Sequence, residues 1–131
     1  MDIDQISGAI VDASMKIHSA LGPGLLENAY EACLIHLLRK NGFHVARQVD
    51  IPVTFDGLKI DAGYRLDLLV NDVVVVELKS VEKLLPIHQA QMITYLRLSG
   101  KKVGLLINFN VPHLKDGIKR MVNHYVKETE D

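Results

Sequence analysis

The chain lacks the features of a secreted, membrane-spanning or disulfide-stabilised protein. Cys33 is the only cysteine among 131 residues, so no disulfide can form within the chain. No apolar stretch approaches the roughly 20 residues that span a bilayer. The acidic start, Met1–Asp4, has no basic segment of the kind that opens a signal peptide. We therefore expect a cytoplasmic protein that makes no membrane contact.

Positive charge is also scarce. The 15 Lys and Arg against 16 Asp and Glu give a formal net charge of −1. Proteins that bind nucleic acid unaided usually carry a positive excess, because phosphate neutralisation supplies most of the non-specific affinity. A nucleic-acid enzyme of this composition would need its basic residues gathered on one face, or a homodimer or protein partner. For a homodimer, we expect residues 51–53 and the apolar side of the first helix to be shared.

The chain does have the composition and patterning of one globular α/β domain. Hydrophobic residues make up 48% and charged residues 24%, so we expect one domain over residues 1–131. Apolar spacing predicts helices over 3–21, 25–40 and 87–98, and strands over 44–55, 58–62, 64–70, 73–81 and 103–109. Residues 114–122 fit either a short helix or, over 118–122, an edge strand. The order of elements predicts a mixed central sheet flanked by helices.

The strongest chemical signal follows a run of four valines. Val73–Val76 predict a strand buried on both faces, yet Glu77 and Lys79 follow directly. Burying an unpaired charge in such a strand costs on the order of several kcal/mol of folding free energy. With Asp67 on the preceding strand, these residues predict a divalent-metal site with a lysine beside it. The alternative interpretation is a structural cross-strand ion pair.

The metal-site hypothesis constrains the turn between the two strands. A two-residue loop at Asn71–Asp72 would pair Asp67 with Val76 and turn Asp67 away from Glu77. We therefore predict a three- or five-residue loop, or a bulge, that sets Asp67 opposite Glu77.

Two further groups of residues are candidates for the same site. Gln91 and Tyr95 lie four residues apart and so share one face of the predicted third helix, although a solvated amphipathic face would give the same spacing. Glu27 lies in the first turn of the second helix, where a carboxylate favours the helix dipole. It is either a dipole partner or a third carboxylate that approaches Asp67 and Glu77.

Taken together, these residues resemble a known family. The spacing Gly24-x-x-Glu27-x-x-Tyr30, the pattern Asp67…Glu77-Leu78-Lys79 and the pair Gln91-x-x-x-Tyr95 look like the GxxExxY family of the PD-(D/E)XK nuclease superfamily. The similarity extends from about residue 6 to residue 122. The proline that gives the superfamily its name is replaced by Leu66.

The resemblance implies a restriction-endonuclease-like αβββαβ core and a metal-dependent nuclease. It implies that Asp67, Glu77 and Glu27 bind Mg²⁺ or Mn²⁺ and that Lys79 is the catalytic lysine, with Gln91 and Tyr95 in the site. The family label itself does not specify a substrate, and our leading hypothesis is a nuclease that cuts DNA in repair, recombination or defence. The alternative function is a catalytically silent nuclease-fold module that binds nucleic acid or a protein.

Overall fold

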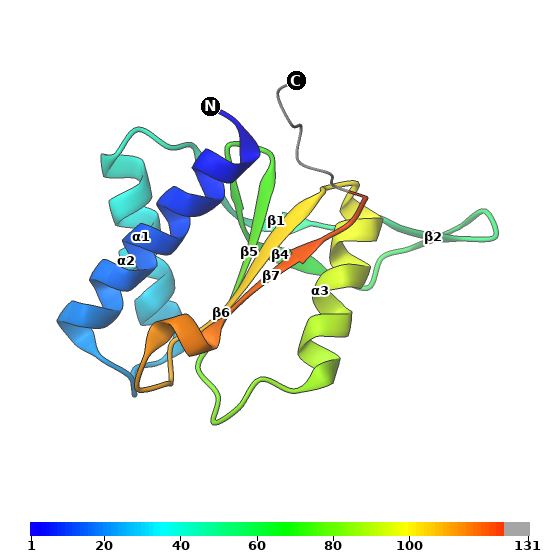
Figure 1. Cartoon of the computed structure of the whole chain (residues 1–131). Helices are drawn as coiled ribbons and strands as arrows, with labels where there is room; N and C mark the ends of the chain where they lie inside the picture. Colours follow the sequence, from blue (N-terminus) through cyan, green and yellow to red (C-terminus); the bar gives the residue numbers. More distant parts are fainter. Residues whose placement is uncertain (125–131) are drawn as a thin grey trace, which may run out of the picture.

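The computed structural model describes residues 1–124 and has a mixed sheet with helices on both faces (Figure 1). The helices are α1 (Ile3–Leu21), α2 (Glu27–Lys40), α3 (Pro86–Ser99) and the short 3-10 helix η1 (Leu114–Gly117). The strands are β1 (Val45–Asp50), β2 (Val53–Phe55), β3 (Leu58–Ile60), β4 (Arg65–Val70), β5 (Val74–Lys79), β6 (Val103–Asn108) and β7 (Ile118–Val122). Among these described residues, no helix is long and apolar enough to cross a membrane.

The central sheet has five strands in the order β1-β4-β5-β6-β7. Strand β4 pairs antiparallel with both β1 and β5, whereas β6 pairs in parallel with β5. Helix α3 connects these two parallel strands, as a parallel pair requires a crossover. This is the expected αβββαβ arrangement, with a mixed sheet consistent with a restriction-endonuclease-like fold.

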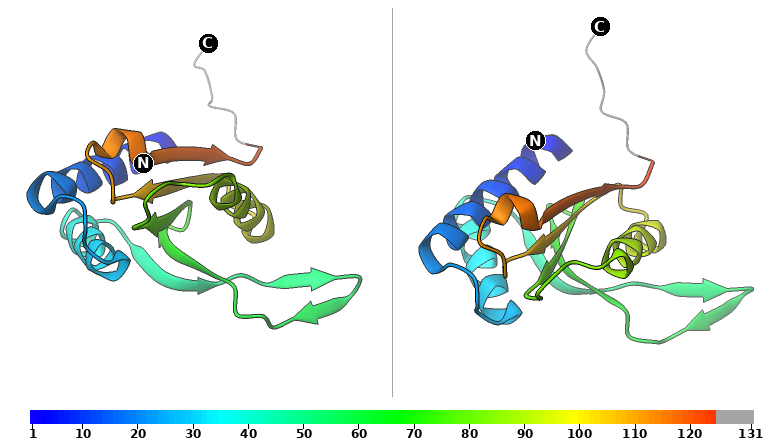
Figure 2. Two further views of the ribbon diagram at one scale, coloured as in Figure 1. Left: turned by 90° about the horizontal axis from the view of Figure 1, so that it is seen from below. Right: turned by 60° about the horizontal axis from the view of Figure 1, so that its bottom comes forward.

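Two clusters of buried side chains lie on the two faces of the sheet. Figure 2 shows α1 and α2 on one side of the sheet and α3 on the other. The α1–α2 cluster joins residues such as Ile10 and Leu34 to Leu68, Val76 and Leu78 of the sheet. The α3 cluster joins Met92 and Leu96 to residues such as Leu69 and Val75. These two clusters tell which face of the sheet each apolar strand residue occupies.

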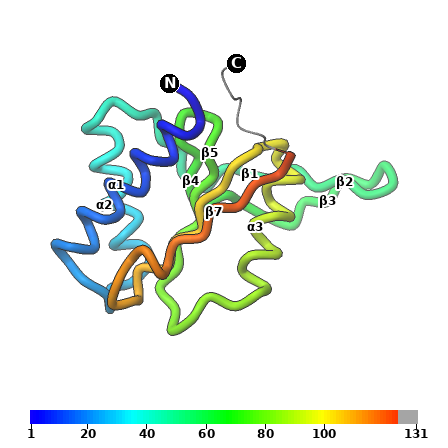
Figure 3. Tube along the Cα trace, viewed as in Figure 1, coloured from blue at the N-terminus to red at the C-terminus, as the bar shows by residue number. Residues whose placement is uncertain are grey.

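The region predicted as a strand over 44–55 is divided in two. Strand β1 forms the edge of the central sheet, while β2 pairs only with β3 and makes a separate two-stranded arm. Pro52, which has no N–H to donate to a sheet, lies between them. The arm projects from the body of the molecule (Figure 3).

Of the two surfaces expected to join two copies of the chain, the apolar side of α1 is buried within one copy, and so is Ile51, whereas Pro52 is exposed and Val53 is half-buried. Ile6, Ile10 and Ile17 of α1 belong to the α1–α2 cluster. Ile51 is 5% exposed and packs in the α3 cluster. These buried side chains stabilise the single chain, and the homodimer itself stays a prediction.

The last described element settles the ambiguity over residues 114–122. Residues Leu114–Gly117 form η1, and Ile118–Val122 form β7, which pairs antiparallel with β6 at the second edge of the sheet. The edge-strand alternative is thus the correct one for 118–122.

Candidate active site

The loop between β4 and β5 has the length that the metal-site hypothesis requires. Val70 pairs with Val74 and Leu68 with Val76, so Asn71–Val73 form a three-residue loop. Asn71 and Asp72 adopt positive φ angles of 49° and 60°, which residues with short polar side chains tolerate best. Continued by one residue, the same register sets Asp67 opposite Glu77, as predicted.

Asp67 and Glu77 meet where the ladder between the two strands stops. The backbone N–H of Asp67 donates to Glu77 Oε1 at 3.0 Å, and the N–H of Leu78 donates to Asp67 Oδ2 at 3.1 Å. Each carboxylate therefore replaces a backbone partner that a continued ladder would supply. This exchange fixes both carboxyl groups at the opening between β4 and β5.

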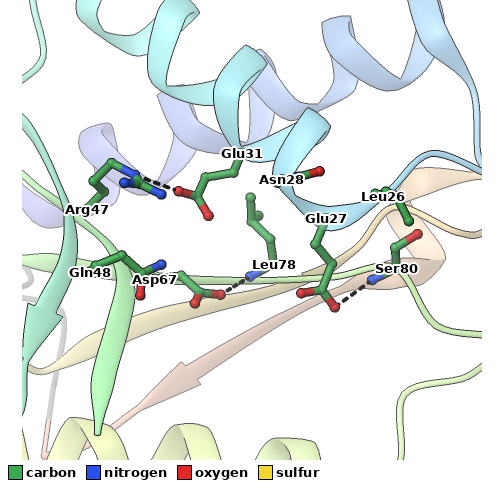
Figure 4. A pocket seen from close by; sticks show the side chains of 9 residues that line it. All are labelled: Leu26, Glu27, Asn28, Glu31, Arg47, Gln48, Asp67, Leu78 and Ser80. Carbon is green, nitrogen blue, oxygen red and sulfur yellow. Dashed lines mark hydrogen bonds and ion pairs between the residues drawn. The ribbon is translucent and has the colours of Figure 1, made fainter. Parts of the chain in front are cut away.

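A break in strand alternation decides where Asp67 points. Leu66 packs in the α3 cluster and Leu68 in the α1–α2 cluster, although residues two apart share a face in a regular strand. Leu69 is again on the α3 side. Asp67 therefore turns out of its regular alternation and lines a cavity beside α2 (Figure 4).

The surroundings of Glu77 disfavour the ionised form of its carboxyl group. Glu77 is 6% exposed. Burial, the Asp67 charge and a hydrogen bond with the Asp67 side chain raise the pKa of Glu77 from 4.5 to about 9. The backbone hydrogen bond from Asp67 and the charge of Lys79 act in the opposite direction. A cation bound between the two carboxylates would remove the repulsion and favour the ionised form.

Lys79 ends β5 beside these carboxylates and makes no structural ion pair with them in the described part of the chain. The strand end itself is held tightly. Phe109 N–H donates to the Lys79 carbonyl at 3.0 Å, and the buried Asn108 amide exchanges two hydrogen bonds with the backbone of Val81. The alternative of a structural cross-strand ion pair is therefore not what the described residues form.

The Gly24–Tyr30 segment forms a hydrogen-bonded turn into α2 that places Glu27 at the site. Gly24 has a φ of 100°, which favours glycine. The buried Tyr30 hydroxyl donates to the Gly22 carbonyl at 2.6 Å and accepts from Leu25 N–H at 3.1 Å. The Tyr30 ring stacks on Phe109 with centroids 4.4 Å apart.

This turn is hydrogen-bonded to Ser80, the residue that follows Lys79. Ser80 Oγ donates to the Leu25 carbonyl at 2.6 Å, and Ser80 N–H donates to Glu27 Oε1 at 3.3 Å. Glu27 thus begins α2 with its carboxylate facing the end of β5 (Figure 4). It reaches the same cavity as Asp67 from the opposite wall.

Helix α3 contributes from the other face of the sheet. Gln91 Nε2 donates to the Tyr95 hydroxyl at 3.0 Å, so the shared helix face is formed as predicted. Partial burial raises the pKa of Tyr95, as do the charges of Glu77, Tyr64 and Asp67. Tyr95 is therefore within the electrostatic influence of both carboxylates, and its ring centroid lies 6.4 Å from that of Tyr64.

The cavity beside α2 has a volume of about 540 Å³, and several of its lining residues were not predicted from the sequence. Its lining consists of Leu26, Glu27, Asn28, Glu31, Arg47, Gln48, Asp67, Leu78 and Ser80. Arg47, the cation in this set, pairs with Glu31 at 3.0 Å. These residues and Tyr64 carry no motif, and only the pairing of β1 with β4 brings Arg47 and Gln48 to the site.

The donor set fits a hard divalent cation with water in most of its coordination sphere. Within residues 1–124, no three side chains of His, Cys, Asp or Glu gather closely enough to hold a metal ion. The prediction that Glu27 lies close enough to Asp67 and Glu77 to form a three-carboxylate metal site is therefore wrong for the described residues. Mg²⁺ commonly uses one or two carboxylates and keeps several waters, and Asp67 and Glu77 meet that need.

Comparison with known proteins gives one match. A family model described as the PD-(D/E)XK nuclease superfamily matches residues 4–121, a range that contains every residue of the site. No curated protein matches the chain, and no solved structure does so either.

Proposed function

Since the chain belongs to the PD-(D/E)XK nuclease superfamily, we propose that it is a Mg²⁺- or Mn²⁺-dependent nuclease that hydrolyses phosphodiester bonds of DNA. The observation that carries the proposal is the meeting of Asp67 and Glu77 at the opening between β4 and β5, with Lys79 two residues further along. A purely structural site would gain nothing from a second carboxyl group beside the buried Glu77, because the charge of Asp67 disfavours the ionisation of Glu77.

In this proposal, Asp67 and Glu77 hold the cation, and Glu27 faces the site from the cavity wall, where it would join the metal ligands only by moving closer to them. A divalent ion there supplies a more acidic water and offsets negative charge on the phosphate. Lys79 carries an ammonium free of ion pairs among the described residues, so it can orient the attacking water and stabilise the charge that develops.

Gln91 and Tyr95 have a positioning role in the proposal. Because Gln91 donates to the Tyr95 oxygen, the hydroxyl proton of Tyr95 is left to donate to a phosphate oxygen. The raised pKa of Tyr95 keeps that proton in place at neutral pH. Tyr95 therefore offers a neutral donor that does not compete for the metal.

We further assign the chain to the GxxExxY branch of the superfamily. The spacing of Gly24, Glu27 and Tyr30 supports this assignment. Gly24 supplies the positive φ of the turn, the Tyr30 hydroxyl holds that turn through the Gly22 carbonyl, and Glu27 accepts from the N–H of Ser80 after β5. The net charge of −1 supports the proposal that a second copy or a protein partner adds phosphate contacts. Light scattering together with salt-dependent DNA binding would test that association.

The main test is a cleavage screen with matched variants. Single-stranded, duplex, flapped and junction DNA, and RNA, are incubated with the protein in Mg²⁺, Mn²⁺ or EDTA. We expect metal-dependent cleavage by the parent and a loss of at least about 100-fold in Lys79→Ala, the size of effect that follows loss of one electrostatic stabiliser. Lys83→Ala, at an exposed position four residues further on, is the control.

Two results would overturn the proposal in different ways. Cleavage by Lys79→Ala at the parent's rate would show that the activity comes from elsewhere. Metal-dependent binding of DNA without cleavage of any substrate would favour the catalytically silent binding module.

A further inference from the structure

Gln48 has a backbone conformation that its place in β1 does not explain. Its φ of 52° is in the left-handed region, which residues other than glycine, asparagine and aspartate seldom adopt. The pairs on either side, Arg47 with Leu68 and Val49 with Leu66, keep one register. The conformation therefore does not accommodate an inserted residue, as it would in a bulge.

The effect of this conformation is to turn one side chain. Ala46 and Val49 both pack in the α3 cluster, although residues three apart face opposite sides of a regular strand. The alternation of β1 therefore breaks at Arg47 and Gln48, and both side chains line the cavity beside α2.

The break in β1 faces the break in β4. By the register of the flanking pairs, Gln48 lies opposite Asp67, the residue at which β4 loses its own alternation. Both side chains enter the same cavity (Figure 4). The turn of Asp67 serves the carboxylate pair with Glu77. The turn at Gln48 lets Val49 join its partner Leu66 in the α3 cluster, and it leaves the Gln48 side chain facing the cavity.

The Gln48 side chain is exposed and makes no hydrogen bond with another described residue. Its neighbour Arg47 is held by Glu31 at 3.0 Å. Backbone strain of this kind clusters at functional sites, where the surroundings hold it in place. A free amide aimed at the carboxylate site has donors to offer to a ligand.

We propose that Gln48 is a substrate-binding residue of this site, whose amide N–H donates to a non-bridging phosphate oxygen of the nucleic-acid strand. This inference rests on the proposed nuclease function. A neutral amide suits the position because Glu27, Glu31 and Asp67 already make the cavity wall acidic. An ammonium there would pair with Asp67 and compete with the cation.

The test separates the side chain from the backbone. Gln48→Gly suits a positive φ and removes the whole side chain, whereas Gln48→Met keeps the length of the side chain without its polar atoms. His124→Gly is the matched control, because His124 has a φ of 56° and follows β7, at the opposite edge of the sheet from β1. Cleavage is measured in Mg²⁺ or Mn²⁺, and binding is measured with a fluorescein-labelled DNA strand in Ca²⁺.

We expect Gln48→Gly and Gln48→Met to cleave about 100-fold more slowly, the usual effect of losing one donor to a transition-state oxygen. We also expect Gln48→Gly to melt no lower than the parent, and His124→Gly to cleave normally. Cleavage by Gln48→Gly within about twofold of the parent would overturn the proposal, because the position would then serve the backbone alone.

The binding measurement keeps this proposal distinct from the nuclease proposal. If the parent binds DNA but does not cut, the nuclease function fails, and Gln48 is judged by affinity. A loss of about tenfold in both variants, one hydrogen bond's worth, then supports the contact, and unchanged affinity refutes it. If the parent neither binds nor cuts nucleic acid, both proposals are refuted.

Discussion

Replacing Glu77 by glutamine should stabilise the protein, and the gain should grow with pH. The pKa of Glu77 is raised to about 9 by burial, by Asp67 and by their hydrogen bond, against 4.5 for a free side chain. Between these two values, the folded chain binds a proton that the unfolded chain has released. The free energy of unfolding of the parent therefore falls as pH rises through this window.

The size of the effect follows from the two pKa values. From pH 4.5 to pH 7 is 2.5 units, and each unit corresponds to about 1.4 kcal/mol. The metal-free parent should thus lose about 3 kcal/mol by pH 7, and less than about 1 kcal/mol at pH 5. Glu77→Gln lacks this loss at every pH, because glutamine does not ionise.

Urea unfolding at pH 5, 6, 7 and 8 in EDTA measures both proteins. The titration of the six histidines is common to them and cancels in the difference. Glu82→Gln, an exposed position, measures the effect of a glutamate-to-glutamine change outside the site. A difference between parent and Glu77→Gln that stays constant with pH would refute the raised pKa, whatever the size of that difference.

Two other predictions test the metal and the frame of the site. Saturating Mg²⁺ or Mn²⁺ should stabilise the parent by about 2.7 kcal/mol at 100 times the dissociation constant, and thermal melts should show no such gain in Asp67→Asn; an equal gain in both would remove Asp67 from the ligand set. Gly117→Ala should destabilise the chain by about 1–3 kcal/mol or more, because a Cβ there would collide with the backbone carbonyl of Asn108. Gly8→Ala in α1 meets nothing within 4 Å and should stabilise by about 0.5–1 kcal/mol; urea unfolding of the two variants giving the same sign would contradict this account.

The sequence determined the elements and the layers because their signals are local. Helical spacing in 3–21 predicted α1 with its observed bounds, and the valines before Glu77 predicted a strand buried on both faces. The requirement that Asp67 face Glu77 predicted a three- or five-residue loop or a bulge, and the register shows the three-residue loop. The spacing of Gln91 and Tyr95 likewise predicted a contact that the structure contains.

Local patterns did not separate the arm from the sheet. The alternation over 44–55 was interpreted as one strand, because the residues of β2 are as strand-like as those of β1. Which partner a strand pairs with depends on contacts far along the chain, and β1 pairs with β4 while β2 pairs with β3. The tail was ambiguous for the same reason, since β7 exists through its pairing with β6.

The tertiary structure alone decided which side chains enter the site and how their charges interact. Gln48 and Asp67 leave strand alternation at one cross-strand position, and no residue type announces such a break. The raised pKa of Glu77 depends on burial and on Asp67, both of which exist only after β4 and β5 pair. Sequence fixes the period and the chemical character of each segment, whereas the placement of charges and the turning of side chains arise from cross-strand geometry that forms only in the folded chain.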